Sequence, residues 1–147
     1  MPDKIVIDKI KKSAVSEVWV TLEEYQGQRL VHVREYFHPA DNPEWLPTKK
    51  GVTIPPELLG KAVDAAEALA KRSAVGIVAE LDRGNRAKLC FAIAEFQRHI
   101  YGELRIYYVE NADSKDWKPG KGVTLPLAVL GRLAEALHMA EDYLDSQ

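Results

Sequence analysis

Alternating hydrophobic and polar residues predict strands in the first half of the chain, because a strand with one buried face has a side-chain period of two. Residues 26–28 (Gln-Gly-Gln) separate two of these stretches, and Gly27 can adopt the positive φ that a tight hairpin requires. After Pro55 and Pro56, apolar residues recur at helical spacing through about residue 72. The first half is therefore expected to form strands over 4–12, 18–25, 30–37 and 50–54, followed by one helix.

The second half repeats this order of elements. Adding 71 to the numbers of Arg34 and Tyr36 gives Arg105 and Tyr107, and many other positions match at the same offset. A repeat this long that occurs only twice excludes a solenoid and indicates two fused copies of one unit, as in a captured symmetric dimer. The second copy is expected to form strands over 76–81, 87–96, 100–109 and 121–125, a turn over 82–85, and a helix that begins after Pro126.

These elements predict an α+β fold, in which each four-stranded antiparallel sheet is followed by a helix. Each helix is expected to cover one face of its sheet and to leave the other face open, with the two helices packed together. We expect the units to span residues 1–74 and 75–147. A unit this small buries too little surface to be stable alone, so the two units are expected to share a core in one compact pseudo-dimer.

The open face of the third strand carries residue types suited to binding nucleic acid. His32, Arg34 and Tyr36 share this face, and the alternation is expected to place Arg34 and Tyr36 beside Trp19 and Tyr25 of the neighbouring strand. Sequence-tolerant binding of single strands needs exposed rings for the bases and cations along the backbone. These residue types suit the binding of single-stranded nucleic acid, but aromatic residues on strands more often belong to the core, and the pattern alone favours the core for Tyr36 and Tyr107.

The run Arg34-Glu35-Tyr36-Phe37, the hairpin before it and the segment Pro47 to Gly51 after it resemble the single-stranded DNA-binding domain of the transcriptional positive cofactor 4 family. In that family, an aromatic residue at the mouth of a hairpin precedes a strand that ends in Arg-Glu-Tyr and an aromatic, and the following loop ends in Pro, basic residues and Gly. The resemblance covers nearly all of the first repeat, and the second repeat is a weaker match. Family members are homodimers whose curved sheets form a channel for opposing single strands, so the resemblance implies that this chain supplies both halves of a channel.

The resemblance also implies the residues that would bind. Ring stacking would fall to Tyr25, Phe37, Phe96 and Tyr108, and phosphate contacts to Arg34, Lys49, Lys50, Arg105, Lys118 and Lys121. Trp19, Tyr36, His99 and Tyr107 complete the expected set, with a structural supporting role left open for Tyr36 and Tyr107. Trp45 and Trp117 lie in the long loops, where they cover the sheet, stack on a base or close the loop.

The two halves of the expected channel differ in their lining. Trp19, Thr21 and Glu23 line one half, and Cys90, Ala92 and Ala94 line the other. The hairpins also lack the lysines that are usual in the family, with glutamines in the first copy and Gln97, Arg98 and His99 in the second. The halves of the channel are therefore expected to be unequal.

The composition of the chain limits which binding partners and cofactors are expected. The chain of 147 residues has a formal net charge of −2, so any binding of a polyanion depends on local placement of charge. Cys90 is the only cysteine and the four histidines lack metal-ligand spacing, so no disulfide, zinc site or other cofactor is expected. No apolar run reaches the roughly 18 residues of a membrane span, which favours the cytoplasm, with nucleoid association in a prokaryote.

No enzyme is expected, because the sequence contains no nucleophile and base pair, no Gly-rich phosphate loop and no clustered carboxylates. The predicted function is binding of single-stranded DNA, or of RNA, in transcription regulation or genome maintenance. Transcription machinery and further self-association are the other partners considered. The alternative is a protein interaction module that kept the fold and lost nucleic-acid binding.

Overall fold

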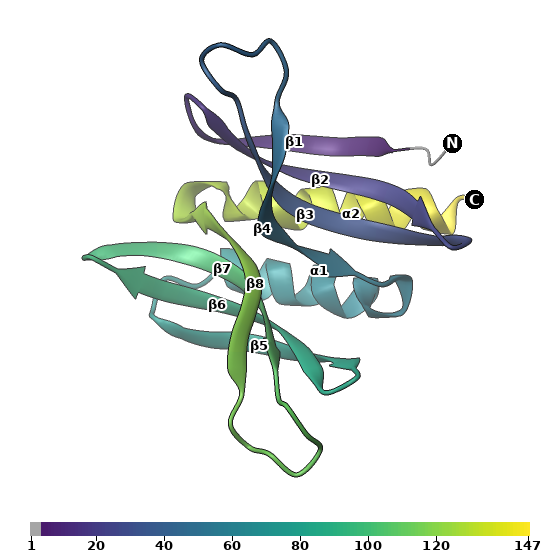
Figure 1. Ribbon diagram of the computed structural model, residues 1–147, viewed down its shortest axis with the longest axis vertical. Helices are drawn as coiled ribbons and strands as arrows, with labels where there is room; N and C mark the ends of the chain where they lie inside the picture. Colours follow the sequence, from purple (N-terminus) through teal and green to yellow (C-terminus); the bar gives the residue numbers. More distant parts are fainter. Residues whose placement is uncertain (1–3) are drawn as a thin grey trace.

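The computed structural model describes residues 4–147 as two antiparallel sheets, each followed by a helix (Figure 1). In both sheets the strands pair in sequence order. The predicted α+β class and the two-fold repetition of sheet and helix are confirmed. The first half contains β1 (Ile5–Ser13), β2 (Ser16–Tyr25), β3 (Gln28–Phe37), β4 (Leu46–Ile54) and α1 (Pro56–Ala70), and the second contains β5 (Gly76–Gly84), β6 (Ala87–Phe96), β7 (His99–Tyr108), β8 (Lys118–Pro126), the 3-10 turn η1 (Leu127–Val129) and α2 (Leu130–Asp145).

Two-residue turns with positive φ at both central residues close the β2–β3, β5–β6 and β6–β7 hairpins, because this geometry matches the twist of the paired strands. Gln26 and Gly27 have φ of 52° and 77°, which confirms the predicted turn at Gly27. In the β5–β6 hairpin the positive-φ pair is Asn85 and Arg86, so the predicted turn over 82–85 is wrong and β5 continues to Gly84.

The fourth strand of each half is longer than predicted, because it pairs with the third strand beyond a bulge. In the first half Arg34 pairs with Gly51 and Tyr36 pairs with Pro47, so extra residues of β4 stand opposite Glu35. The Thr48 hydroxyl donates to the Glu35 carbonyl oxygen at 2.8 Å and accepts from the Lys50 amide at 3.1 Å, which replaces the missing ladder bonds.

The bulge in the second half is one residue shorter. Arg105 pairs with Gly122 and Tyr107 pairs with Pro119. The offset of 71 between the halves therefore becomes 72 over the start of β8, where Pro119 takes the place of Pro47. This extra residue in β4 gives the first half two adjacent lysines where the second half has Gly120 and Lys121.

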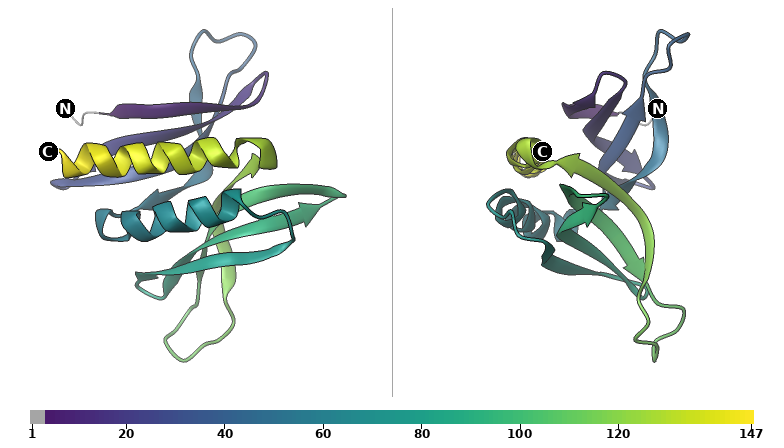
Figure 2. Two further views of the ribbon diagram at one scale, coloured as in Figure 1. Left: turned by 180° about the vertical axis from the view of Figure 1, so that it is seen from behind. Right: turned by 90° about the vertical axis from the view of Figure 1, so that its left-hand side faces the viewer.

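The helices are exchanged between the halves. They lie side by side on one side of the molecule (Figure 2), where α1 contacts β5 and β6 of the second half and α2 contacts β1 and β2 of the first. The expectation that each helix covers a face of its own sheet is wrong, because α2 lies mainly against β1 and β2, and α1 contacts β3 and β4 of its own half less than β5 and β6. Because β4 and β8 are the strands adjacent to one another at the junction, a helix that leaves either strand begins beside the other sheet.

One continuous hydrophobic core results from this exchange, as the small size of each unit predicts. It contains Val20 and Val33 from the first sheet, Phe91 from the second, and Leu69 and Leu137 from the two helices, all of them fully buried. The halves therefore share their burial of apolar surface, and each stabilises the other.

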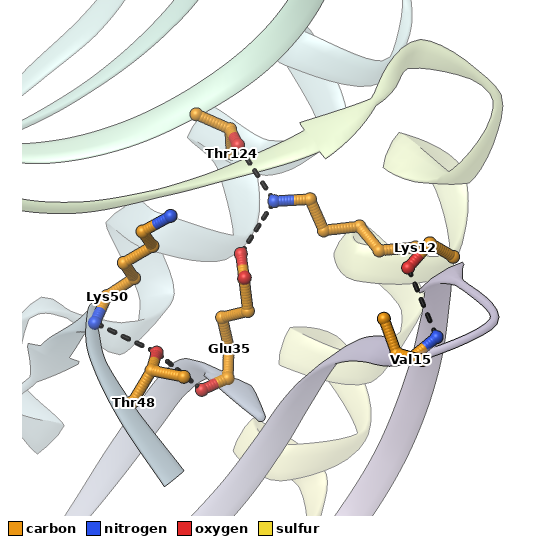
Figure 3. Close-up of polar contacts among 7 residues, drawn as sticks. Lys12, Val15, Glu35, Thr48, Lys50 and Thr124 are labelled. Atoms are coloured by element: carbon orange, nitrogen blue, oxygen red, sulfur yellow. Dashed lines mark hydrogen bonds and ion pairs between the residues drawn. The ribbon is translucent and has the colours of Figure 1, made fainter. Parts of the chain in front are cut away.

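Lys12 joins the halves by polar contacts (Figure 3). Its Nζ donates to Glu35 Oε1 at 2.6 Å and to Thr124 Oγ1 at 3.0 Å, and the Glu35 side chain is only 13% exposed. The corresponding positions of the second half hold Arg83 and Ile106, so no acid matches Glu35 there, and burial lowers the pKa of Arg83. The ion pair between Lys12 and Glu35 is thus a property of the first half alone.

Replacing Lys12 by methionine keeps most of the apolar stem and leaves the Glu35 carboxylate without its partner. The free energy of unfolding should fall by about 1–3 kcal/mol, the usual cost of an unmet partly buried polar group. Urea denaturation at pH 7 measures this, with Lys11→Met as the control because Lys11 is exposed on the same strand. A loss no larger than that of the control would show that the bridge contributes nothing to stability.

Candidate nucleic-acid interface

The strands β4 and β8 lie next to each other on the side of the molecule opposite the helices (Figure 1). Residues of both strands line a groove there. Its volume is about 320 Å³. Both halves contribute basic side chains to it, namely Lys49 and Lys50 from β4, Arg105 from β7 and Lys121 from β8. We call this the cationic groove; Gly120, Gly122, Val123 and Thr124 complete its lining.

The lysines of the cationic groove are free to meet an anion. Lys49, Lys50 and Lys121 are exposed, and none of their amines forms an ion pair within residues 4–147. Figure 3 shows the Lys50 amine without a polar partner, close to the Lys12 bridge. Like charges from two halves of an acidic chain thus gather in one place, which makes the groove a local positive field.

The two matching arginines are held by the bulges. Arg34 Nη1 donates to the Thr48 carbonyl oxygen at 2.8 Å, and Arg105 Nη1 donates to the Gly120 carbonyl oxygen at the same distance. A Cβ atom at Gly122 would lie 2.7 Å from Cζ of Arg105, so the glycine after the lysine makes room for the guanidinium. The Lys-Gly motif therefore positions an arginine as well as presenting a lysine.

The arginines differ in their charge environment. Arg105 Nη2 forms an ion pair with Glu103 Oε2 at 2.9 Å. His32 stands at the corresponding position of the first half, where burial, aided by the charges of Arg34 and Lys4 and opposed by Glu23, lowers the pKa of His32 from its ordinary 6.5. Because that imidazole is neutral at pH 7, Arg34 keeps more of its positive field than Arg105.

Trp19 and Tyr36 stack on one another. Their ring centroids are 3.8 Å apart with an interplanar angle of 13°, and their side chains are only 9% and 4% exposed. Lys9 Nζ lies 4.2 Å from the Trp19 ring centroid, and Lys4 Nζ lies 4.6 Å from that of Tyr36. This is the supporting arrangement that the sequence left open for Tyr36.

The expectation that Tyr25 lies beside Arg34 is wrong. Tyr25 pairs with Gln28 at the turn of the β2–β3 hairpin, whereas Arg34 pairs with Trp19 near the middle of the sheet. Alternation correctly predicts the face of Tyr25, but the face alone does not fix the position of a residue along the strand. The hairpin register separates these two side chains.

Four of the five remaining rings of the predicted set are exposed at the ends of the sheets, and Tyr107 is half-buried. Tyr25 and Phe96 are 61% and 63% exposed, at the tips of hairpins that point in opposite directions (Figure 1). Phe37 and Tyr108 are 44% and 41% exposed, at the other ends of β3 and β7. His99 pairs with Phe96 in its hairpin and is exposed. These rings flank the cationic groove and do not line it.

The remaining predicted contacts lie near the long loops. Lys118 Nζ pairs with Glu110 Oε1 at 2.7 Å, so this lysine is partly neutralised. Trp45 stacks on His38 with centroids 4.9 Å apart, which closes the first loop. Trp117 is more exposed, and Lys88 Nζ lies 4.3 Å from its ring centroid. The two tryptophans thus have different surroundings in the two halves.

Thr124, which was not among the predicted residues, lines the cationic groove, and its hydroxyl accepts a hydrogen bond from Lys12. Its match with Thr53 at the offset of 71 was the available signal. Across residues 4–147, no three His, Cys, Asp or Glu side chains gather where they could hold a metal ion. None of the helices in this part of the chain has the length and apolarity needed to cross a membrane.

Comparison with known proteins gives a consistent result. Residues 13–64, from the end of β1 into α1, match the sequence model of the protein family described as transcriptional coactivator p15 (PC4). Two crystal structures of a PC4 homolog from Burkholderia pseudomallei are similar to this chain. The match to the first structure has 30% sequence identity and a TM-score of 0.42, and it covers 48% of this chain and 100% of the homolog's chain. The match to the second structure has 32% sequence identity and a TM-score of 0.42, and it covers 47% of this chain and 90% of the homolog's chain. No curated protein matches the sequence.

Proposed function

Because the chain belongs to the PC4 family, we propose that it binds single-stranded nucleic acid along the cationic groove and acts, without catalysis, in transcription regulation or genome maintenance. One observation carries the proposal: cations from both halves gather between β4 and β8 in a chain whose net charge is −2. Family membership supports nucleic-acid binding of the coactivator type. The preference for single strands rests on the exposed rings.

Two kinds of contact are expected. Lys49, Lys50 and Lys121 contact phosphates, and each neutralised phosphate makes the binding of single strands weaker by about 0.7 log units per tenfold rise in salt. The exposed rings of Tyr25 and Phe96 reach bases on either side of the groove, where stacking contributes roughly 1–3 kcal/mol per base. Single strands are preferred because the bases of a duplex are already stacked on one another.

A fluorescent strand of roughly 20 nucleotides, titrated with the protein in an anisotropy assay, tests this function. We expect the single strand to bind more tightly than the same sequence as duplex. The logarithm of the affinity should fall with the logarithm of the salt concentration with a slope of about −2 to −3, as three or four phosphate contacts require. An RNA strand of the same sequence measures the preference between DNA and RNA.

Absence of binding at low salt would contradict the proposal. The fold would then serve the alternative function, recognition of another protein through the open sheet or its edges. An affinity that does not change with salt concentration would also count against binding at the cationic groove, because the contacts proposed there are with phosphates.

A further inference from the structure

The second half contains a hollow where the first half has an aromatic ring. Cys90 occupies the position that corresponds to Trp19, and the two residues pair with the corresponding arginines of their sheets. A cavity of about 180 Å³ opens beside Cys90. It is lined by Ile77, Lys88, Cys90, Tyr107 and Trp117, and we call it the Cys90 hollow.

In the first half, an aromatic ring occupies the position that corresponds to the Cys90 hollow. There the Trp19 indole stacks on Tyr36 with centroids 3.8 Å apart and an interplanar angle of 13°. Tyr107 corresponds to Tyr36 and lines the Cys90 hollow, but Cys90 has no ring to place on it. A flat aromatic group that enters the hollow can therefore take the position over Tyr107 that Trp19 takes over Tyr36.

We propose that the Cys90 hollow receives one unpaired base of the bound strand, stacked on Tyr107; this inference rests on the function proposed above. A nucleobase combines a flat ring with a polar edge, and the hollow offers both surfaces. Tyr107, Ile77 and Trp117 supply ring and apolar contacts. Lys88, which lines the hollow, donates to Glu80, the residue that pairs with Cys90 on the neighbouring strand, so a hydrogen-bond donor and an acceptor stand together beside the hollow.

A second ring of the first half is also replaced by a smaller side chain in the second half, and this leaves space for the bound nucleic-acid strand next to the Cys90 hollow. Val109 corresponds to His38, which in the first half stacks on Trp45. In the second half a larger cavity of about 580 Å³ lies beside Val109, and it shares Lys88 and Trp117 with the Cys90 hollow. The nucleotide next to the inserted base can therefore lie in this neighbouring space, whose charged lining is Arg86, Asp82 and the ion pair of Lys88 with Glu80.

Filling the hollow tests the proposal. Cys90→Trp restores the arrangement of the first half and should weaken binding of a single-stranded oligonucleotide roughly 5- to 150-fold, the range that loss of one stacked base produces. Cys90→Ala is the matched comparison: it removes the thiol but leaves the hollow open, and should weaken binding far less than Cys90→Trp does. Circular dichroism and urea denaturation establish that each variant folds.

Oligonucleotides that each lack one base at a single position supply the second measurement. With the unchanged protein, the abasic site should weaken binding at the position that enters the hollow. With Cys90→Trp, the same abasic site should cost nothing further, because two changes that remove one contact are not additive.

Equal binding by Cys90→Trp and the unchanged protein would overturn the inference while leaving the cationic groove intact. Failure of the unchanged protein to bind any single strand would instead overturn the proposed function. If Cys90→Trp does not fold, Cys90→Leu fills part of the hollow with a smaller side chain. Additive losses from Cys90→Leu and the abasic site would then count against the inference.

Discussion

Replacing Lys49, Lys50 and Lys121 together by alanine is expected to weaken binding of a single-stranded oligonucleotide roughly 100-fold at about 0.1 M salt. Each phosphate contact contributes about 0.7 log units at this salt concentration, relative to 1 M, and three contacts are removed. The same variant should show a salt slope that is shallower by about 2. The three amines are exposed and unpaired within the described residues, so their removal should leave the stability of the fold nearly unchanged.

The control for this variant removes the same charge elsewhere. Lys61, Lys71 and Arg72 are exposed at α1 and its C-terminal end, on the side of the molecule away from the cationic groove (Figure 2). Replacing these three residues by alanine should weaken binding only slightly, because charges farther than a Debye length of about 10 Å are screened. A similar loss in both variants would show that net charge, and not the groove, decides affinity.

Replacing Phe91 by alanine is expected to lower the free energy of unfolding by about 3–5 kcal/mol, through lost burial and the cavity that remains. Phe91 is fully buried on β6 and belongs to the core that both halves share. A loss of this size is a large part of the roughly 5–15 kcal/mol that stabilises a domain. Urea denaturation measures it.

Phe96→Ala is the matched control, since Phe96 is on the same strand and is 63% exposed. Its effect on stability should stay within about 0.5 kcal/mol. Because one core serves both sheets, the Phe91 variant should still unfold in a single transition that is the same by different spectroscopic probes. Two separate transitions would mean that the halves fold independently and would contradict the shared core.

The repeat, the strand order and the helix positions could be predicted because they depend on local patterns. Val31 and Val33 alternate with polar residues, Gly27 marks a turn, and Pro56 begins a helix. Each of these signals lies within a few residues of the element it predicts. The Lys-Gly segments were found in the same way, by comparing the two copies at a fixed offset.

The exchange of helices and the surroundings of the rings could not be predicted, because they depend on contacts between distant parts of the chain. No local signal tells whether α1 covers its own sheet or β5 and β6. The stack of Trp19 on Tyr36 depends on strand register, which also moves Tyr25 away from Arg34. The cationic groove exists only because β4 and β8 meet, so local patterns predicted its residues, and only the family resemblance predicted that both halves form one channel.

Fusing two copies has a consequence that a dimer of identical chains cannot have. In a symmetric dimer, a strand that crosses the two-fold axis meets the same groups whichever way it runs. Here Trp19 covers Tyr36 in the first half, whereas Cys90 leaves a hollow beside Tyr107 in the second. The bulge of the first half carries Lys49 and Lys50, and the corresponding bulge of the second half carries a single lysine, Lys121. The two directions of a crossing strand are therefore chemically distinct, and the protein can favour one polarity from 5′ to 3′ over its reverse.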